Sequence, residues 1–209
     1  GIPYQIIGGT KFYDRKEIKD IIAYLKFISN NKDSISFTRI INFPHRGIGK
    51  TTVDKILNKT TSNNFINVLL DADDLDISIK QKDTLKKIGK LLAELTKRAV
   101  IENPAIIVND LLDAIKIKDF YENNTTSDSM DRWANIEELV VSIEDYQHNN
   151  KENTLSDYLE EVSLLTDIDR WNDKNDVLTL MTIHSAKGLE FDFVYLVGLE
   201  DGLFPMIRG

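Results

Sequence analysis

A chain of 209 residues can form one or two domains with a buried core, and 42% hydrophobic and 29% charged residues are typical of a globular protein. The sequence contains no cysteine, which excludes disulfide bonds, cysteine-ligated zinc and thiol nucleophiles. No apolar run approaches the roughly 20 residues of a membrane helix, and no export signal opens the chain. We therefore expect a cytoplasmic protein that does not bind membranes.

The charge is unevenly distributed along the chain. The formal net charge of −8 taken alone argues against a nucleic-acid-binding protein. Residues 1–60, however, contain 11 Lys and Arg against 5 Asp and Glu, whereas residues 61–209 contain 15 against 29. Contact with a polyanion is expected only in the basic first segment, although a solvated charge bias explains the asymmetry equally well.

The first predicted elements are a short strand and a helix. Tyr4 to Ile7 is a β-rich run that Gly8 and Gly9 terminate, and an amphipathic helix follows through residues 18–28. Asp14 is placed to cap this helix, with Glu17 as its partner in a capping box.

The middle of the chain is predicted to be helical. Gly89 is the only glycine between residues 50 and 187, and three apolar stripes recur at helical spacing over residues 85–99, 136–146 and 155–165. Pro104 after Asn103 begins a shorter helix, and Thr154 with Asp157 forms a candidate cap for the last stripe. We interpret these stripes as core.

The last predicted elements are two strands, at residues 177–183 and 193–197. Both are apolar, β-branched runs, which favour a parallel sheet covered on both faces. Because so few strands cannot complete such a sheet, the predicted fold is a mainly α-helical domain inserted between incomplete α/β segments from both chain ends.

One candidate site is the run Arg46-Gly47-Ile48-Gly49-Lys50-Thr51. It ends like a P-loop, but Pro44 stands where that motif requires its first glycine, and no strand precedes it. We expect a turn between two helices instead, in which the glycines let the backbone approach a phosphate and a helix N-terminus presents unpaired N–H groups. Arg46 and Lys50 add positive charge. An ordinary helix–turn–helix corner is the alternative.

A second candidate site follows the strand at residues 177–183. Its polar side chains can donate to phosphates, and Glu190 can accept from a sugar hydroxyl. The donors are Thr182, His184, Ser185 and Lys187. No histidine has companions at metal-ligand spacing, so we expect no metal site.

Together these segments resemble one family, the superfamily 1 DNA helicases of the UvrD/Rep/PcrA type. Residues 8–20, Gly-Gly-Thr-Lys-Phe-Tyr-Asp-Arg-Lys-Glu-Ile-Lys-Asp, resemble motif IVa, and residues 182–191, Thr-Ile-His-Ser-Ala-Lys-Gly-Leu-Glu-Phe, resemble motif V. Arg46 to Gly49 resembles the duplex-contacting GIG element. The resemblance covers essentially the whole chain.

The resemblance implies a domain organisation. In the family, two RecA-like domains, 1A and 2A, sandwich ATP and carry helical insertions, 1B and 2B. By similarity, residues 1–30 and 174–209 are two pieces of the parallel-sheet domain 2A, and residues 31–173 are the helical 2B domain.

The resemblance also implies site residues. Motif V would contact single-stranded DNA through Thr182, His184, Ser185 and Lys187. Glu190 and Gly188 would contact the nucleotide. The GIG segment would contact duplex DNA through Arg46, Gly47, Ile48, Gly49, Lys50 and Thr51. Motif IVa contributes Phe12, Arg15 and Glu17.

The implied function belongs to a longer parent protein, an ATP-dependent 3′-to-5′ helicase that unwinds DNA in repair or replication with ATP and Mg²⁺. We find no Walker A loop, Walker B strand or motif VI in this sequence, so we expect the chain itself not to hydrolyse ATP. We expect it to grip a single-strand/duplex DNA junction and to meet protein partners through 2B. A protein-interaction and autoinhibitory module with negligible DNA binding is the alternative, and Pro44 disfavours a stand-alone P-loop enzyme.

Overall fold

The computed structural model describes residues 4–7, 12–60, 64–123, 126–150, 153–170, 177–181, 186 and 190–199. The chain divides into two compact units. One, Lys11–Trp171, is helical; the other combines the two chain ends, Gly1–Thr10 and Asn172–Gly209.

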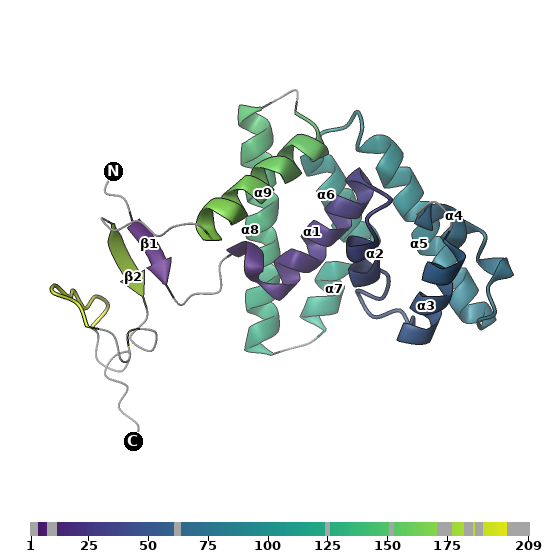
Figure 1. Cartoon of the computed structure of the whole chain (residues 1–209), viewed down its shortest axis with the longest axis horizontal. Helices are drawn as coiled ribbons and strands as arrows, with labels where there is room; N and C mark the ends of the chain where they lie inside the picture. Colours follow the sequence, from purple (N-terminus) through teal and green to yellow (C-terminus); the bar gives the residue numbers. More distant parts are fainter. Residues whose placement is uncertain are drawn as a thin grey trace, which may run out of the picture. The chain divides into compact units, whose positions relative to one another are not determined.

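The helical unit contains all the described α-helices (Figure 1). The elements in chain order are β1 Tyr4–Ile7, η1 Phe12–Asp14, α1 Lys16–Ser29, α2 Ser34–Ile40, α3 Lys50–Lys59, α4 Phe65–Leu70, η2 Ala72–Asp74, α5 Ile79–Arg98, α6 Pro104–Ala114, α7 Ile117–Glu122, α8 Ser127–Asn149, α9 Leu155–Arg170 and β2 Leu178–Met181.

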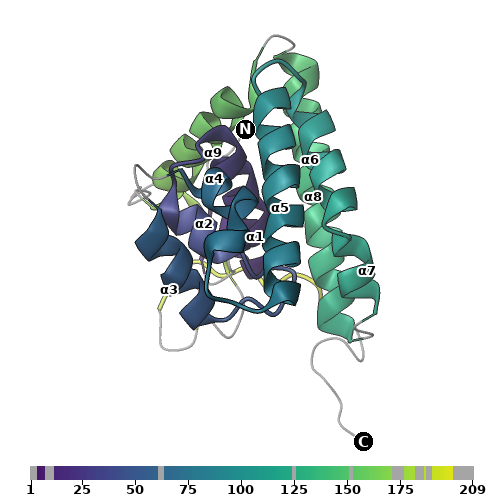
Figure 2. The same ribbon diagram turned by 90° about the vertical axis from the view of Figure 1, so that its right-hand side faces the viewer.

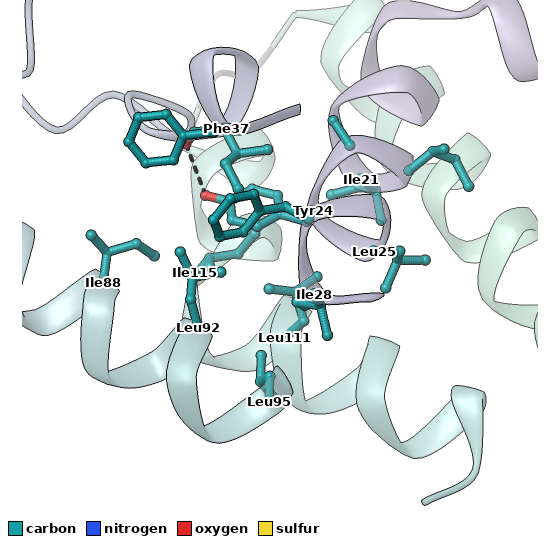
Figure 3. Packing of buried hydrophobic residues seen from close by; sticks show 14 of the residues in the cluster. Ile21, Tyr24, Leu25, Ile28, Phe37, Ile88, Leu92, Leu95, Leu111 and Ile115 are labelled. Atoms are coloured by element: carbon teal, nitrogen blue, oxygen red, sulfur yellow. Dashed lines mark hydrogen bonds between the residues drawn. The ribbon is translucent and has the colours of Figure 1, made fainter. Parts of the chain in front are cut away.

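Helix α1 is the centre of the helical unit. It contacts α2, α5, α8 and α9, and its apolar positions from Ile18 to Ile28 are buried (Figure 1). Figure 3 shows Ile28 of α1 facing Leu92 and Leu95 of α5 and Leu111 of α6. The core therefore joins segments that lie more than 60 residues apart, and the predicted helical stripes are confirmed as core as far as Val162, the last of their apolar side chains that the structure describes.

Helix α5 lies between α4 and α6 (Figure 2). Its approach to α4 depends on Gly89, because a Cβ atom added there would lie 2.8 Å from Cβ of Leu69. This contact explains the glycine that interrupts the otherwise glycine-free middle of the chain.

Helix caps confirm some predicted boundaries and correct one. Asn103 caps α6 by accepting from the N–H of Ala105 at 2.7 Å, and the N–H of Thr154 donates to Asp157 at 2.7 Å. The predicted cap at Asp14 is wrong. The N-cap of α1 is Arg15, with no side-chain cap bond, and Asp14 forms an ion pair with Lys19 at 2.7 Å instead.

The other unit contains a parallel strand pair. β1 and β2 pair in parallel register from Tyr4 opposite Leu178 to Ile7 opposite Met181. The predicted parallel direction is confirmed, but the expected cover on both faces is not, since Leu178 is 49% and Leu180 45% exposed. The strand expected at residues 193–197 is absent: this run is irregular and exposed. A strand needs a neighbouring ladder, and within the described residues β1 and β2 pair only with each other.

The compact units divide the chain at other points than the expected 2A and 2B domains. The expected 2A piece, residues 1–30, spans the division after Thr10, because α1 buries its apolar face against the other helices of the helical unit. The second division, before Asn172, lies close to the expected residue 174. No helix among the described residues is long and apolar enough to cross a membrane.

Candidate nucleic-acid interface

The GIG segment forms the connection between α2 and α3. Gly47 has φ +74°, a backbone conformation that residues with a Cβ rarely adopt. Gly49 is the N-cap of α3 and has an extended backbone. The helix begins at Lys50, and Phe37 lies in α2 rather than in a strand. The segment therefore has the expected turn between two helices and lacks the strand of a P-loop.

Arg46 holds this turn against the end of α2. Its Nη1 donates to the carbonyl oxygens of Phe43 at 2.6 Å and Ile40 at 3.0 Å, and its Nη2 donates to the hydroxyl of Tyr24 at 2.6 Å. Carbonyls at a helix C-terminus lack partners within the helix and favour a cation. The half-buried guanidinium thus bonds to carbonyl and hydroxyl oxygens of the protein itself, whereas the family resemblance implies a contact with duplex DNA.

Tyr24 ties the turn to α1. Its side chain is fully buried, its hydroxyl donates to the carbonyls of Ile40 and Phe43, and the guanidinium of Arg46 lies 5.9 Å from its ring centroid. Burial raises the pKa of Tyr24 to about 12, while neighbouring Arg46 opposes the shift. The hydroxyl therefore stays protonated and remains a donor at neutral pH.

Two side-chain amides bond to the backbone of the turn. Oδ1 of Asn42 accepts from the N–H groups of Arg46 at 2.8 Å and Ile48 at 3.1 Å. Nε2 of Gln81, in the first turn of α5, donates to the carbonyl of Gly47 at 3.0 Å. The turn is consequently fixed by α1, α2 and α5.

The six predicted residues divide into internal and exposed groups. Ile48 is 1% exposed and anchors the turn in the core, so its side chain does not face solvent. Gly47, Gly49, Lys50 and Thr51 are exposed. The N–H groups of Lys50 and Thr51, the first two of α3, have no partner among the described residues, whereas the N–H of Thr52 donates to the carbonyl of Gly49 at 3.0 Å. The exposed face of the turn therefore offers two backbone donors, one ammonium group and one hydroxyl.

The motif IVa residues meet α8. Arg15 donates to Oδ1 of Asn135, and Nδ2 of Asn135 donates to Oε1 of Glu17 at 2.6 Å. The guanidinium of Arg15 also lies 5.3 Å from the ring centroid of Phe12. The structure therefore brings Phe12, Arg15 and Glu17 together, and Arg15 and Glu17 bond to a residue of α8 that lies 118 to 120 positions later in the chain.

Most of motif V lies outside the described residues. This holds for Thr182, His184, Ser185, Lys187 and Gly188, whereas Glu190 is described and exposed. No group of three His, Asp or Glu side chains that could hold a metal ion occurs among the described residues.

Comparison with known proteins decides the family. The whole chain, residues 1–209, matches the UvrD-like helicase C-terminal domain. The chain belongs to this family. It is 37% identical over 216 residues to the ATP-dependent DNA helicase PcrA of Bacillus subtilis (strain 168), covering 100% of this chain and 29% of the relative. It is 40% identical over 211 residues to the PcrA protein of Staphylococcus aureus (strain Mu50), covering 99% of this chain and 29% of the relative.

The resemblance to UvrD/PcrA-type helicases is therefore confirmed at the level of the family. The chain spans about three tenths of the length of the curated relatives it matches. Within this UvrD-like domain, sequence reasoning missed Tyr24, Asn42 and Gln81 as supports of the GIG turn. The sequence gives a local signal for Asn42, since an Asn before a turn commonly accepts from nearby N–H groups. It gives no such signal for Tyr24 and Gln81, which lie 22 and 34 residues from their partners in the turn.

Proposed function

We propose that this chain is the 2B domain, with flanking 2A segments, of an ATP-dependent 3′-to-5′ DNA helicase, and that its GIG turn grips the duplex at a single-strand/duplex junction. Residues 31–173, nearly all of which lie in the helical unit Lys11–Trp171, would be 2B, and residues 1–30 and 174–209 would be pieces of the RecA-like domain 2A. The observation that carries the proposal is the rigid turn that leaves the N-terminus of α3 open.

The proposed contact uses backbone donors more than side-chain charge. The N–H groups of Lys50 and Thr51 at the start of α3 have no partner among the described residues, and such donors at a helix N-terminus favour a phosphate. The exposed Lys50 and Thr51 add an ammonium group and a hydroxyl. Contacts of this kind position a protein on DNA without reading its sequence. We expect binding that depends on salt and not on sequence.

Arg46 has a different role in this proposal. Because its guanidinium already donates to the carbonyls of Ile40 and Phe43 and to Tyr24, it is a positioning residue that shapes the turn. Removing both Arg46 and Lys50 would combine two effects, the loss of a DNA contact and a change in the structure of the turn. Lys50 is the cleaner test.

ATP and Mg²⁺ are proposed as cofactors of the longer parent protein. The described residues do not offer a metal-binding group, and only Glu190 of the two predicted nucleotide-contacting residues is described. ATP hydrolysis would supply the free energy of unwinding in the parent. The function of this chain rests on DNA contact, and we expect no ATP hydrolysis by the chain alone.

The test is fluorescence anisotropy of a labelled duplex with a 3′ single-stranded tail at several salt concentrations. We expect Lys50→Ala to reduce the log–log salt slope by about 0.9, the value for one phosphate contact. Lys97→Ala is the matched control, because Lys97 is also exposed but lies about 27 Å along α5 from its start.

Equal slopes for wild type and Lys50→Ala would remove the turn from the DNA contact. No binding at any salt concentration would favour the second candidate function, a protein-interaction and autoinhibitory module. Large apolar side chains at the α5–α6 connection support that alternative, since Val100 is 70% and Ile101 84% exposed.

A further inference from the structure

Two lysines of α3 pair with an acidic segment that follows α4. Nζ of Lys55 lies 3.0 Å from Oδ2 of Asp76, and Nζ of Lys59 lies 3.2 Å from Oδ2 of Asp74. Both ammonium groups also donate to the main-chain carbonyls of the same two residues. Lys55 and Lys59 are four residues apart and so lie on one face of α3.

Two lysines of α5 reach the same segment from another helix. Nζ of Lys86 lies 2.6 Å from Oδ2 of Asp73, and Nζ of Lys82 donates to the Asp73 carbonyl at 2.8 Å. These lysines are also four residues apart. Four ammonium groups from two helices thus converge on residues 73–76.

These four lysines adjoin the GIG turn. Thr51, Lys55 and Lys59 follow one another at four-residue intervals, so a single face of α3 runs from the turn to both lysines. On α5, Lys82 follows Gln81, whose side chain contacts the carbonyl of Gly47. A DNA backbone whose phosphate is bound at the turn would therefore reach these lysines with its next phosphates.

The aspartates that occupy the lysines are replaceable. The side chains of Asp73, Asp74 and Asp76 are 73%, 71% and 103% exposed, and exposed ion pairs contribute at most about 1 kcal/mol each. A carboxylate and a phosphate offer an ammonium group the same chemistry, an anionic oxygen acceptor. DNA and the acidic segment would therefore compete for the same donors.

We propose that Lys55, Lys59, Lys82 and Lys86, together the lysine ridge, form a second phosphate-binding surface for duplex DNA, and that Asp73, Asp74 and Asp76 limit DNA affinity by occupying it. This inference rests on the proposed function, because the ridge extends the duplex contact that begins at the GIG turn. It also gives the acidic part of the chain a specific role: three of its carboxylates neutralise the surface beside the turn.

The test is a gain of binding. The variant Asp73→Asn/Asp74→Asn/Asp76→Asn removes the competing charges and keeps the side-chain sizes. We expect it to bind the tailed duplex about tenfold more tightly at low salt, with a salt slope steeper by about 0.9 for each ridge lysine that gains a phosphate. Adding Lys55→Ala/Lys59→Ala to this variant should abolish most of the gain.

The matched control is Asp113→Asn/Asp119→Asn/Asp131→Asn. It removes the same number of charges from exposed aspartates on α6, α7 and α8, so general attraction of DNA to a less acidic protein affects both triple variants equally. Thermal unfolding of all variants verifies that the helical unit is intact.

The outcomes separate the two proposals. Equal affinity of the two triple variants, with Lys50→Ala still weakening the wild type, would overturn the lysine ridge and leave the turn contact standing. Unchanged binding by Lys50→Ala together with a gain in the Asp73/Asp74/Asp76 variant would place DNA on the ridge and overturn the contact at the turn.

Discussion

The guanidinium of Arg46 donates to the buried hydroxyl of Tyr24 across 2.6 Å, which joins the GIG turn to the central helix 22 residues earlier in the chain. The same guanidinium covers the carbonyl oxygens at the end of α2. The arginine of this motif is thus a part of the scaffold that holds the exposed donors in place.

Removal of Arg46 should destabilise the protein. Arg46→Ala leaves the carbonyls of Ile40 and Phe43 with fewer donors, and we expect the free energy of unfolding to fall by about 1–3 kcal/mol. Urea denaturation followed by circular dichroism measures this. Lys50→Ala is the control and should change stability by no more than about 0.5 kcal/mol, because Lys50 is exposed. Equal stability of both variants would refute the scaffold role.

Alkaline pH should lower the free energy of unfolding through ionisation of Tyr24. Its pKa is raised to about 12 by burial, so the neutral hydroxyl stabilises the folded state fully below the ordinary tyrosine pKa of about 10, and this stabilisation is lost as the pH rises toward 12. The informative quantity is the difference between two variants, because it cancels the effects of pH that both proteins share. The stability of Tyr24→Phe should decline less between pH 10 and pH 12 than that of the wild type. Parallel declines would contradict the assignment.

Gly89→Ala should be destabilising although alanine is the better helix former. Its Cβ would lie 2.8 Å from Cβ of Leu69, and overpacking of this kind typically costs about 1–3 kcal/mol, against a gain of about 1 kcal/mol from helix propensity. We expect a lower thermal midpoint. Lys90→Ala, at the adjacent exposed position of α5, should leave the midpoint nearly unchanged. A higher midpoint for Gly89→Ala would show that α4 can move away without cost.

The link between motif IVa and α8 should depend on Asn135. Its amide donates to the buried carboxylate of Glu17 at 2.6 Å and its oxygen accepts from Arg15, so Asn135→Ala leaves both groups short of a partner. We expect a loss of about 1–3 kcal/mol in the free energy of unfolding. Asn109→Ala removes an exposed amide that donates to the carbonyl of Ala105 within α6, and it should have little effect. Similar losses in the two variants would mean that the Asn135 contact contributes nothing specific.

Sequence reasoning succeeded where the signal was local. Apolar spacing located α5, α8 and α9, and the Asn103-Pro104 pair placed the start of α6. It failed at Asp14. The N-cap of α1 is Arg15, and the Asp14 carboxylate forms an ion pair with Lys19. It also failed at residues 193–197, since β-propensity cannot form a strand where no neighbouring ladder is provided.

The sequence by itself determined the family, the helical middle of the chain and the position of the GIG turn, because motifs and helical periodicity depend on residues close together in the chain. Only the tertiary structure decided that Arg46 turns inward to Tyr24, that α1 belongs to the helical unit, and that Lys55 and Lys86 converge on one acidic segment. Those facts depend on contacts between residues distant in the chain. Which charged side chains pair within the protein and which stay exposed to solvent is settled by such contacts.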